Sequence, residues 1–293
     1  SEAIGYDYRG SFSAKGSFDF NNWNLDFEGT FVSDDTFLRR FDLSDNTDIV
    51  STLSISKIWS NFSLSIETKH FSLLLPEKDG SEPMVFPIIN LDWKPDFEFF
   101  GGKFNLNVNS VNIIRKTDGN TQRLSIKTSW KKDIITKSGH LIDLGIFTRG
   151  DLYRSTKKYI PNNSTRLLSS NPFGDEINIG RLLPSYFMEW KYPVVSPNGH
   201  TIIEPIVNFT LAPSDKEYLK IPNEDSIAFE LNSVNILDTD RIQGFDRWEY
   251  GNRINYGLQV CHFWGERVIK ALLAQSYRFS VLNYSIRGNG LRK

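Results

Sequence analysis

The sequence has very little cysteine and no long apolar run. Cys261 is its one cysteine among 293 residues, so the chain can form neither an internal disulfide nor a thiolate cage for a metal. Mean hydropathy is -0.36, and no apolar run approaches the roughly 18 residues that mark a membrane-spanning helix. These absences exclude a disulfide scaffold and a helical membrane protein.

An excess of charge of one sign is also lacking. The 34 Lys and Arg residues nearly balance 35 Asp and Glu residues, which leaves a net charge of -1. A nucleic-acid-binding face needs clustered positive charge, and the basic residues here form no runs. We therefore expect no nucleic-acid partner.

Residues of common catalytic and metal sites are sparse. The four histidines, His70, His140, His200 and His262, are widely separated, and the HExxH, GxxxxGK and GxSxG motifs do not occur. The adjacent acids Asp34-Asp35 and Glu224-Asp225 are more typical of solvated turns than of a cation site. The sequence therefore predicts no enzyme, no metal site and no cofactor.

The sequence does have a strict alternation of apolar and polar residues. In its clearest segment the apolar positions are Trp23, Leu25 and Phe27, and the polar positions are Asn24, Asp26 and Glu28. A period of two predicts a strand with one apolar and one polar face. Helical periodicity is weak, apart from one turn expected around 35–40.

About twelve strands are predicted from this alternation. They span 6–20, 23–32, 49–59, 62–74, 84–93, 103–115, 122–132, 140–153, 181–192, 200–211, 248–263 and 267–282. Most of these strands are at least as long as the about 9 to 11 residues with which a tilted strand crosses a bilayer. Tight connections such as Asn21-Asn22 alternate with long ones such as 154–180 and 212–247, an asymmetry typical of outer-membrane barrels.

The predicted fold is therefore an all-β, antiparallel, up-and-down transmembrane β-barrel, or a large curved segment of one, with long extracellular loops. In such a barrel Trp23, Leu25 and Phe27 would face lipid, and Asn24, Asp26 and Glu28 would face the lumen. The aromatic residues near predicted strand ends fit an interfacial girdle; they are Trp23, Trp59, Trp93, Trp190, Tyr192, Trp248 and Trp264. A soluble β-sandwich, which also alternates, is the alternative fold.

The segment 221–258 stands apart because charges of both signs crowd it, and a charge at the bilayer midplane costs about 2 to 4 kcal/mol. Alternation over 227–231 predicts a short strand inside this otherwise irregular loop. We expect a salt-bridge network that folds the loop over the barrel mouth or into the lumen, formed by Glu224, Asp225, Arg241, Asp246, Arg247, Glu249 and Arg253. The alternative is a solvated loop whose ion pairs contribute under about 1 kcal/mol each.

This segment also carries a family resemblance. In order and spacing, PNEDS, FEL, NIL, RIQGFDRWE and GxRxNYGL resemble the barrel of the LptD family of lipopolysaccharide (LPS) assembly proteins. Tyr8-Arg9-Gly10, the segment 23–38 and Gln275-Ser276-Tyr277-Arg278 resemble other parts of the same barrel. The resemblance covers nearly the whole chain and corresponds to the middle part of the barrel domain.

The resemblance implies transport of LPS and its insertion into the outer leaflet of the Gram-negative outer membrane, as part of an LPS translocon. It implies as partners LPS, a plug lipoprotein, outer-membrane lipid and, through another domain, a periplasmic LPS-bridge protein. The family joins its barrel to a periplasmic jelly roll that is usually stapled by disulfides, and neither feature is found here. Residues 1–293 are therefore expected to be a single barrel segment that lacks the gate strands.

Other functions stay open at this point. A general outer-membrane porin or receptor barrel would share the alternation and the loops, but not the FDRWE segment. A soluble β-rich carbohydrate-binding protein and a barrel enzyme are further alternatives. Direct binding of LPS phosphates by the loop arginines is a third option for the charged segment, although the nearby acids compensate those arginines.

Overall fold

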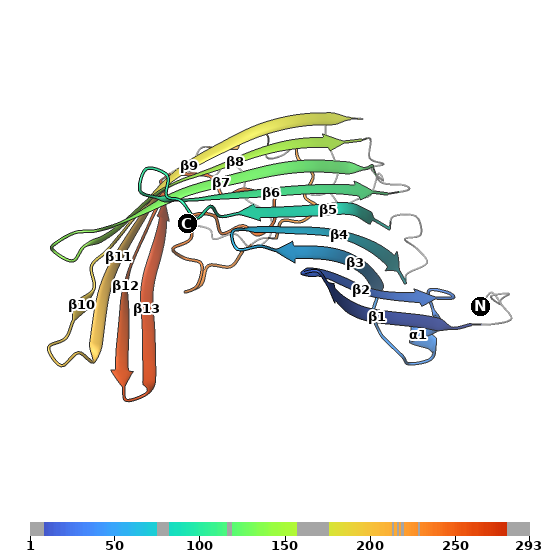
Figure 1. The fold of residues 1–293 in the computed structure, drawn as a ribbon, viewed down its shortest axis with the longest axis horizontal. Coiled ribbons are helices and arrows are strands. Elements are labelled where there is room, and N and C mark those ends of the chain that lie inside the picture. The colour runs from blue at the N-terminus through green and yellow to red at the C-terminus, as the bar shows by residue number, and fades with distance from the viewer. Residues whose placement is uncertain are drawn as a thin grey trace. The chain divides into compact units, whose positions relative to one another are not determined.

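Strands make up nearly all the regular structure of the protein (Figure 1). The computed structural model describes residues 9–74, 82–115, 119–156, 176–212, 214–215, 217, 220–227 and 229–279. The one helix among them, α1 (Phe37–Arg40), has four residues, which confirms the predicted turn. In this described part of the chain, no helix is long and apolar enough to cross a membrane.

The strands follow one another as hydrogen-bonded neighbours. They are β1 (Ser11–Phe20), β2 (Trp23–Val32), β3 (Asp48–Ile58), β4 (Phe62–Leu73), β5 (Met84–Trp93), β6 (Lys103–Ile114), β7 (Thr121–Ile135), β8 (Leu141–Ser155), β9 (Ile177–Lys191), β10 (Val194–Val195), β11 (Thr201–Leu211), β12 (Arg253–Trp264) and β13 (Arg267–Arg278). The sheet keeps this order, except that β9 pairs with β11 and β10 pairs only with β11. The predicted all-β, antiparallel, up-and-down fold is confirmed.

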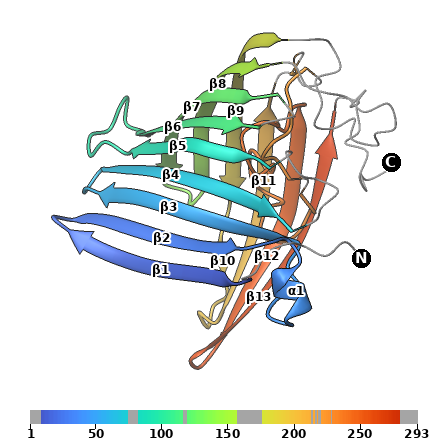
Figure 2. The same ribbon diagram turned by 90° about the vertical axis from the view of Figure 1, so that its right-hand side faces the viewer.

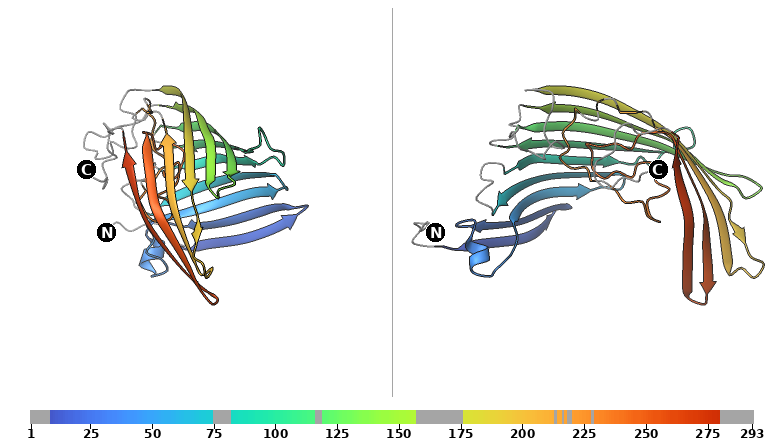
Figure 3. Two further views of the ribbon diagram at one scale, coloured as in Figure 1. Left: turned by 90° about the vertical axis from the view of Figure 1, so that its left-hand side faces the viewer. Right: turned by 180° about the vertical axis from the view of Figure 1, so that it is seen from behind.

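The chain divides into two compact units. Unit 1 comprises 1–93, 107–126 and 151–180, and unit 2 comprises 94–106, 127–150 and 181–293. The strands β6 to β9 contribute residues to both units. Within unit 2, β11, β12 and β13 run side by side, and β12 and β13 pair along their whole length (Figure 3).

The structure corrects several predicted boundaries. The strand predicted from Trp248 begins at Arg253, because 248–252 belongs to the loop that precedes it, hereafter the β11–β12 loop (212–252). The prediction of a short strand over 227–231 is wrong, because only an isolated bridge between Ile227 and Gln243 is found in the described residues there. Turns follow this stretch at 233–237, where Asn232 Oδ1 accepts a hydrogen bond from the N–H of Val234 and Asn235 Nδ2 donates to the Glu230 carbonyl.

Other differences are small. The strand β9 begins four residues before its predicted start at 181, β7 continues to Ile135, and the two-residue β10 was not predicted. The predicted residues 6–8 and 280–282, and much of the loop 154–180, lie outside the described residues.

The register separates an apolar from a polar face in unit 1. Leu25 lies opposite Ile55, whereas its neighbour Asp26 lies opposite Ser54. Paired residues project to the same face, and successive residues project to opposite faces. The apolar set Trp23, Leu25, Phe27 and the polar set Asn24, Asp26, Glu28 therefore lie on opposite faces of β2. That the apolar set faces lipid remains a prediction, developed under the proposed function.

Burial along the middle strands is the reverse of that in a water-soluble protein. Many buried side chains of β7 to β9 are polar or charged; they include Arg123, Ser125, Arg149, Asp151, Ser155, Arg181 and Ser185. Many exposed side chains on the alternate positions are apolar or aromatic; they include Leu124, Ile126, Ile146, Leu152, Leu182, Tyr186 and Met188. A soluble sandwich buries its apolar face in a shared core. Exposure of the apolar face argues against that alternative.

Candidate functional site

The β11–β12 loop lies against the polar face of unit 2, and aromatic contacts seat it there. Trp248 of the loop is 1% exposed and stacks on Phe147 of β8, with ring centroids 5.4 Å apart. The Arg149 guanidinium of β8 lies 5.9 Å from the Trp248 ring, and Lys127 Nζ of β7 lies 3.9 Å from the Phe245 ring. Cation–π attraction of this kind strengthens when the groups are shielded from water.

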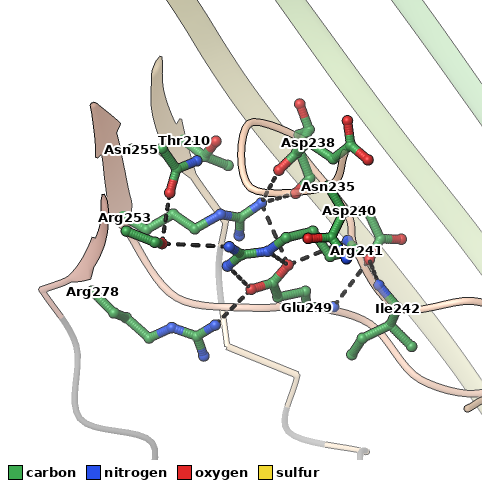
Figure 4. A network of polar contacts seen from close by, with 12 residues as sticks. Thr210, Asn235, Asp238, Asp240, Arg241, Ile242, Glu249, Arg253, Asn255 and Arg278 are labelled. Carbon is green, nitrogen blue, oxygen red and sulfur yellow. Dashed lines mark hydrogen bonds and ion pairs between the residues drawn. The ribbon is translucent and has the colours of Figure 1, made fainter. Parts of the chain in front are cut away.

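Glu249 is the centre of an ion-pair network (Figure 4). Its carboxylate accepts hydrogen bonds from Arg241 Nε at 2.8 Å, from Arg241 Nη2 at closer range, and from Arg278 Nη2 at 2.7 Å. Arg253 Nη2 lies 3.7 Å from the same carboxylate and also donates to the carbonyl of Asp238. The side chains of Arg253 and Glu249 are 0% and 2% exposed. One buried carboxylate thus lies within reach of three guanidinium groups and is the nearest counter-charge to each in the described contacts.

Burial and neighbouring charge act in opposite directions on the acids of this network. Burial alone would raise the pKa of the Glu249 carboxyl, but the hydrogen bond from Arg241 and the charges of the three guanidinium groups hold that pKa below its ordinary value. Asp240 accepts hydrogen bonds from the backbone N–H groups of Ile242 and Glu249, and burial raises the pKa of its carboxyl. The two acids therefore affect stability with opposite signs as pH changes.

Replacing Asp240 by asparagine is expected to leave the free energy of unfolding at neutral pH unchanged or higher. Because the folded-state pKa of Asp240 is raised, its charged form opposes folding, and its contribution becomes more favourable as pH falls through that pKa. The variant should lack this gain on acidification. Unfolding midpoints of wild type and Asp240→Asn between about pH 4 and pH 8 test this; a large loss of stability at neutral pH would contradict it.

A second cluster folds the loop back on itself. The Asp246 carboxylate accepts hydrogen bonds from the backbone N–H groups of Glu224 and Asp225, at 2.6 and 3.0 Å. In return the Asp225 carboxylate accepts hydrogen bonds from the N–H groups of Phe245 and Asp246, at 2.9 and 3.2 Å. Gly244 has φ +90°, and a Cβ there would lie 2.5 Å from the Asp225 carbonyl oxygen, so only glycine allows this close approach.

Three arginines attach this second cluster to its surroundings in unit 2. Arg247 Nη1 donates to the Ile221 carbonyl at 2.9 Å, and Arg149 Nη1 donates to the Arg247 carbonyl at 3.1 Å. Arg181 of β9 donates to the Asp246 carbonyl at 3.1 Å and forms an ion pair with Asp215 at 2.6 Å, and the side chains of Arg181 and Asp215 are 2% and 1% exposed. Removing one partner from a pair this deeply buried would leave an uncompensated charge.

The structure distributes the seven predicted network residues over two clusters. Arg241, Glu249 and Arg253 belong to the first, and Glu224, Asp225, Asp246 and Arg247 belong to the second. In the second cluster the carboxylates of Asp225 and Asp246 accept hydrogen bonds from backbone N–H groups, since a folded-back loop supplies donors at short range. Sequence reasoning missed three arginines of the strands; they are Arg149, Arg181 and Arg278. A charged residue on an otherwise regular strand was the available signal.

The polar face predicted at β2 lies in unit 1 and takes no part in these clusters as described. Asn24 donates a hydrogen bond to Asp19 at 3.1 Å, and Glu28 forms an exposed ion pair with Lys15 at 2.7 Å. In the described residues, no group of three or more His, Cys, Asp or Glu side chains is placed to hold a metal ion. The loop clusters of unit 2 therefore form the candidate site, because their buried ion pairs and hydrogen bonds set the shape of the loop surface that a polar solute or a protein would meet.

Comparisons with known proteins identify the family. The family model LptD, LPS transport system D, matches residues 7–285, and no match was found among curated proteins. Among solved structures, the chain is similar to the β domain of the Bordetella autotransporter BrkA, with 11% identity over 92% of this chain and 91% of that chain and a TM-score of 0.27. Because the family model matches most of the chain, the resemblance in the sequence is confirmed: the chain belongs to the LptD family.

Proposed function

We propose that this chain is part of the barrel that delivers LPS into the outer leaflet of the Gram-negative outer membrane. The family is one of LPS transport and outer-membrane proteins and is not an enzyme family. The proposed partners are LPS, outer-membrane lipid, a plug lipoprotein and a periplasmic LPS-bridge protein.

One observation carries the proposal: unit 2 buries charge on one face and exposes apolar side chains on the other. Arg149 and Arg253 are 0% exposed, whereas Leu182 and Leu273 are 68% and 80% exposed. LPS has a sugar chain that needs a polar route and acyl chains that need lipid. A wall with two such faces keeps the two parts apart, because exposed apolar side chains are stable in lipid and charges are not.

Tryptophans at the strand ends support a membrane position. In unit 1, Trp23 and Trp59 meet edge to face beside short connections, with ring centroids 5.9 Å apart. In unit 2, two tryptophans of the predicted girdle lie at or near the ends of β9 and β12; they are Trp190 and Trp264. Indole rings favour the membrane–water interface. Trp248 is a correction to the predicted girdle, because it lies in the β11–β12 loop and is buried against Phe147 of β8.

The β11–β12 loop would present the surface that the plug lipoprotein or the passing sugar chain meets. Its two clusters tie it to the polar face by hydrogen bonds and ion pairs between groups that are mostly buried. Such a loop keeps one shape while a flexible polar solute moves past it. A general porin would share the two faces of the sheet but not the family match.

Replacing Arg247 by alanine in the full-length protein is expected to weaken association with the plug lipoprotein and to make the outer membrane permeable to large antibiotics. The change removes the hydrogen bond to the Ile221 carbonyl and leaves part of the second cluster without its donor. Co-purification of the lipoprotein and antibiotic sensitivity measure the two effects.

Lys220→Ala is the matched control, because it removes a cation of the same loop from an exposed ion pair with Glu217. That pair contributes less than about 1 kcal/mol, so assembly and the barrier should stay intact. If Arg247→Ala behaved like this control, the loop charges would be merely solvated and would have no role in assembly.

A further inference from the structure

The connection between β5 and β6, residues 94–102 of unit 2, presents exposed phenylalanines (teal loop in Figure 2). Phe97, Phe99 and Phe100 are 59%, 52% and 79% exposed. The rings of Phe99 and Phe100 contact each other edge to face, with centroids 4.5 Å apart. Aromatic surface of this extent is unfavourable in water and marks a contact with something apolar.

The backbone keeps Phe100 there against its conformational preference. Phe100 and Gly101 have φ +51° and +68°, and Phe99 and Gly102 exchange backbone hydrogen bonds of 2.9 and 3.0 Å across them. A two-residue turn with both central residues left-handed favours Asn, Asp and Gly. The same chain uses such residues in the turn Asn21-Asn22, with φ +49° and +64°. A phenylalanine at this position therefore points to a role other than forming the turn.

The turn is held against β7, so the two rings occupy a fixed position. Trp130 Nε1 donates to the Phe99 carbonyl at 2.6 Å, and Lys132 Nζ donates to the Phe100 carbonyl at 3.4 Å. A Cβ on Gly102 would lie 2.6 Å from the Trp130 indole, which shows how closely the turn packs on that ring. By strand alternation, Trp130 shares the apolar face of β7 with Ile126.

We propose that Phe99 and Phe100 insert into the interfacial layer of a phospholipid bilayer and anchor this end of unit 2 there. The inference rests on the proposed function, because it requires the apolar face of the strands to lie in lipid. The two rings continue that face beside the last third of β7, next to the Trp130 indole and the ammonium of Lys132, which can reach the headgroups. This continuity favours lipid over a protein partner.

The test places a fluorescent label at position 100 of the full-length protein in phosphatidylcholine vesicles. In a Cys261→Ser background, Phe100→Cys carries an environment-sensitive fluorophore, and the vesicles contain lipids with a nitroxide either near the headgroup or deep in the acyl chain. We expect loss of most of the fluorescence with the shallow quencher and less with the deep one. Glu98→Cys, exposed in the same connection, is the control that should stay unquenched.

A second labelled position separates this inference from the proposed function. Leu258→Cys, in the middle of β12 on its exposed apolar face, should be quenched by the deep nitroxide. If position 258 is quenched and position 100 is not, the turn faces water or a protein. The proposed anchor is then overturned, whereas the proposed membrane position of the strands is supported. If position 258 is unquenched, the proposed membrane position itself is wrong.

The variant Phe100→Asn gives a readout without a label. Asparagine suits the left-handed backbone, so a purely structural turn predicts a higher urea midpoint of unfolding in the vesicles. The anchor predicts a lower midpoint, because the lipid contact of the ring is lost, while Glu98→Gln should leave the midpoint unchanged. An equal or higher midpoint for Phe100→Asn would overturn the anchor.

Discussion

Replacing Glu249 by alanine is expected to lower the free energy of unfolding by about 3 to 5 kcal/mol, because it leaves buried guanidinium groups without their counter-charge. The side chains of Arg241 and Arg253 are 3% and 0% exposed, so hydration by water cannot replace the lost ion pairs. The β11–β12 loop should then separate from the polar face of unit 2. Urea unfolding in vesicles measures the loss, and protease sensitivity of the loop reports the separation.

The control is Glu217→Ala, which removes a partly exposed carboxylate of the same loop and should cost less than about 1 kcal/mol. Dependence on pH gives a second check. Since the folded-state pKa of Glu249 lies below its ordinary value of 4.5, its stabilising contribution is present above that pH and is lost as pH falls through the lowered pKa. The alanine variant should not show this acid loss. Equal stability of the two variants would mean that the network is not buried.

Replacing Leu53 by arginine is expected to destabilise the protein in a bilayer by about 2 to 4 kcal/mol, because Leu53 lies in the middle of β3 on the apolar face. Leu53 is 48% exposed, so the same change in a water-soluble protein would alter stability by only about 0.5 kcal/mol. Equilibrium unfolding in phosphatidylcholine vesicles measures the difference. The experiment therefore tests whether this exposed face meets lipid or water.

Two matched substitutions sharpen the result. Ser54→Arg places the same charge on the opposite face of β3 and should cost much less. Leu25→Arg lies on the apolar face but close to the beginning of β2 at Trp23, where the cost should fall toward about 0 to 1 kcal/mol. If all three arginines had equal effects, neither the lipid-facing assignment nor the position of the interface near Trp23 would hold.

The sequence by itself determined the long strands of the sheet and which residues of each strand share a face, although not every boundary. In a strand, successive side chains point to opposite sides, so the alternation from Trp23 to Glu28 specifies which residues share a face without reference to the rest of the chain. Turn chemistry is equally local, and Asn21-Asn22 adopts the left-handed conformation that such residues favour. The motifs around FDRWE were sufficient to indicate the family, because order and spacing are properties of the sequence alone.

Only the tertiary structure decided which charges meet. Arg149 contacts the Arg247 carbonyl across 98 positions of sequence, and no local pattern encodes a contact over that separation. Arg181 and Arg278 also contact the loop across long sequence separations, so the sequence did not reveal these contacts. Trp248 is not part of the predicted girdle, because the loop places it against Phe147. A side chain's face follows from its own strand, whereas its partner depends on how distant segments pack.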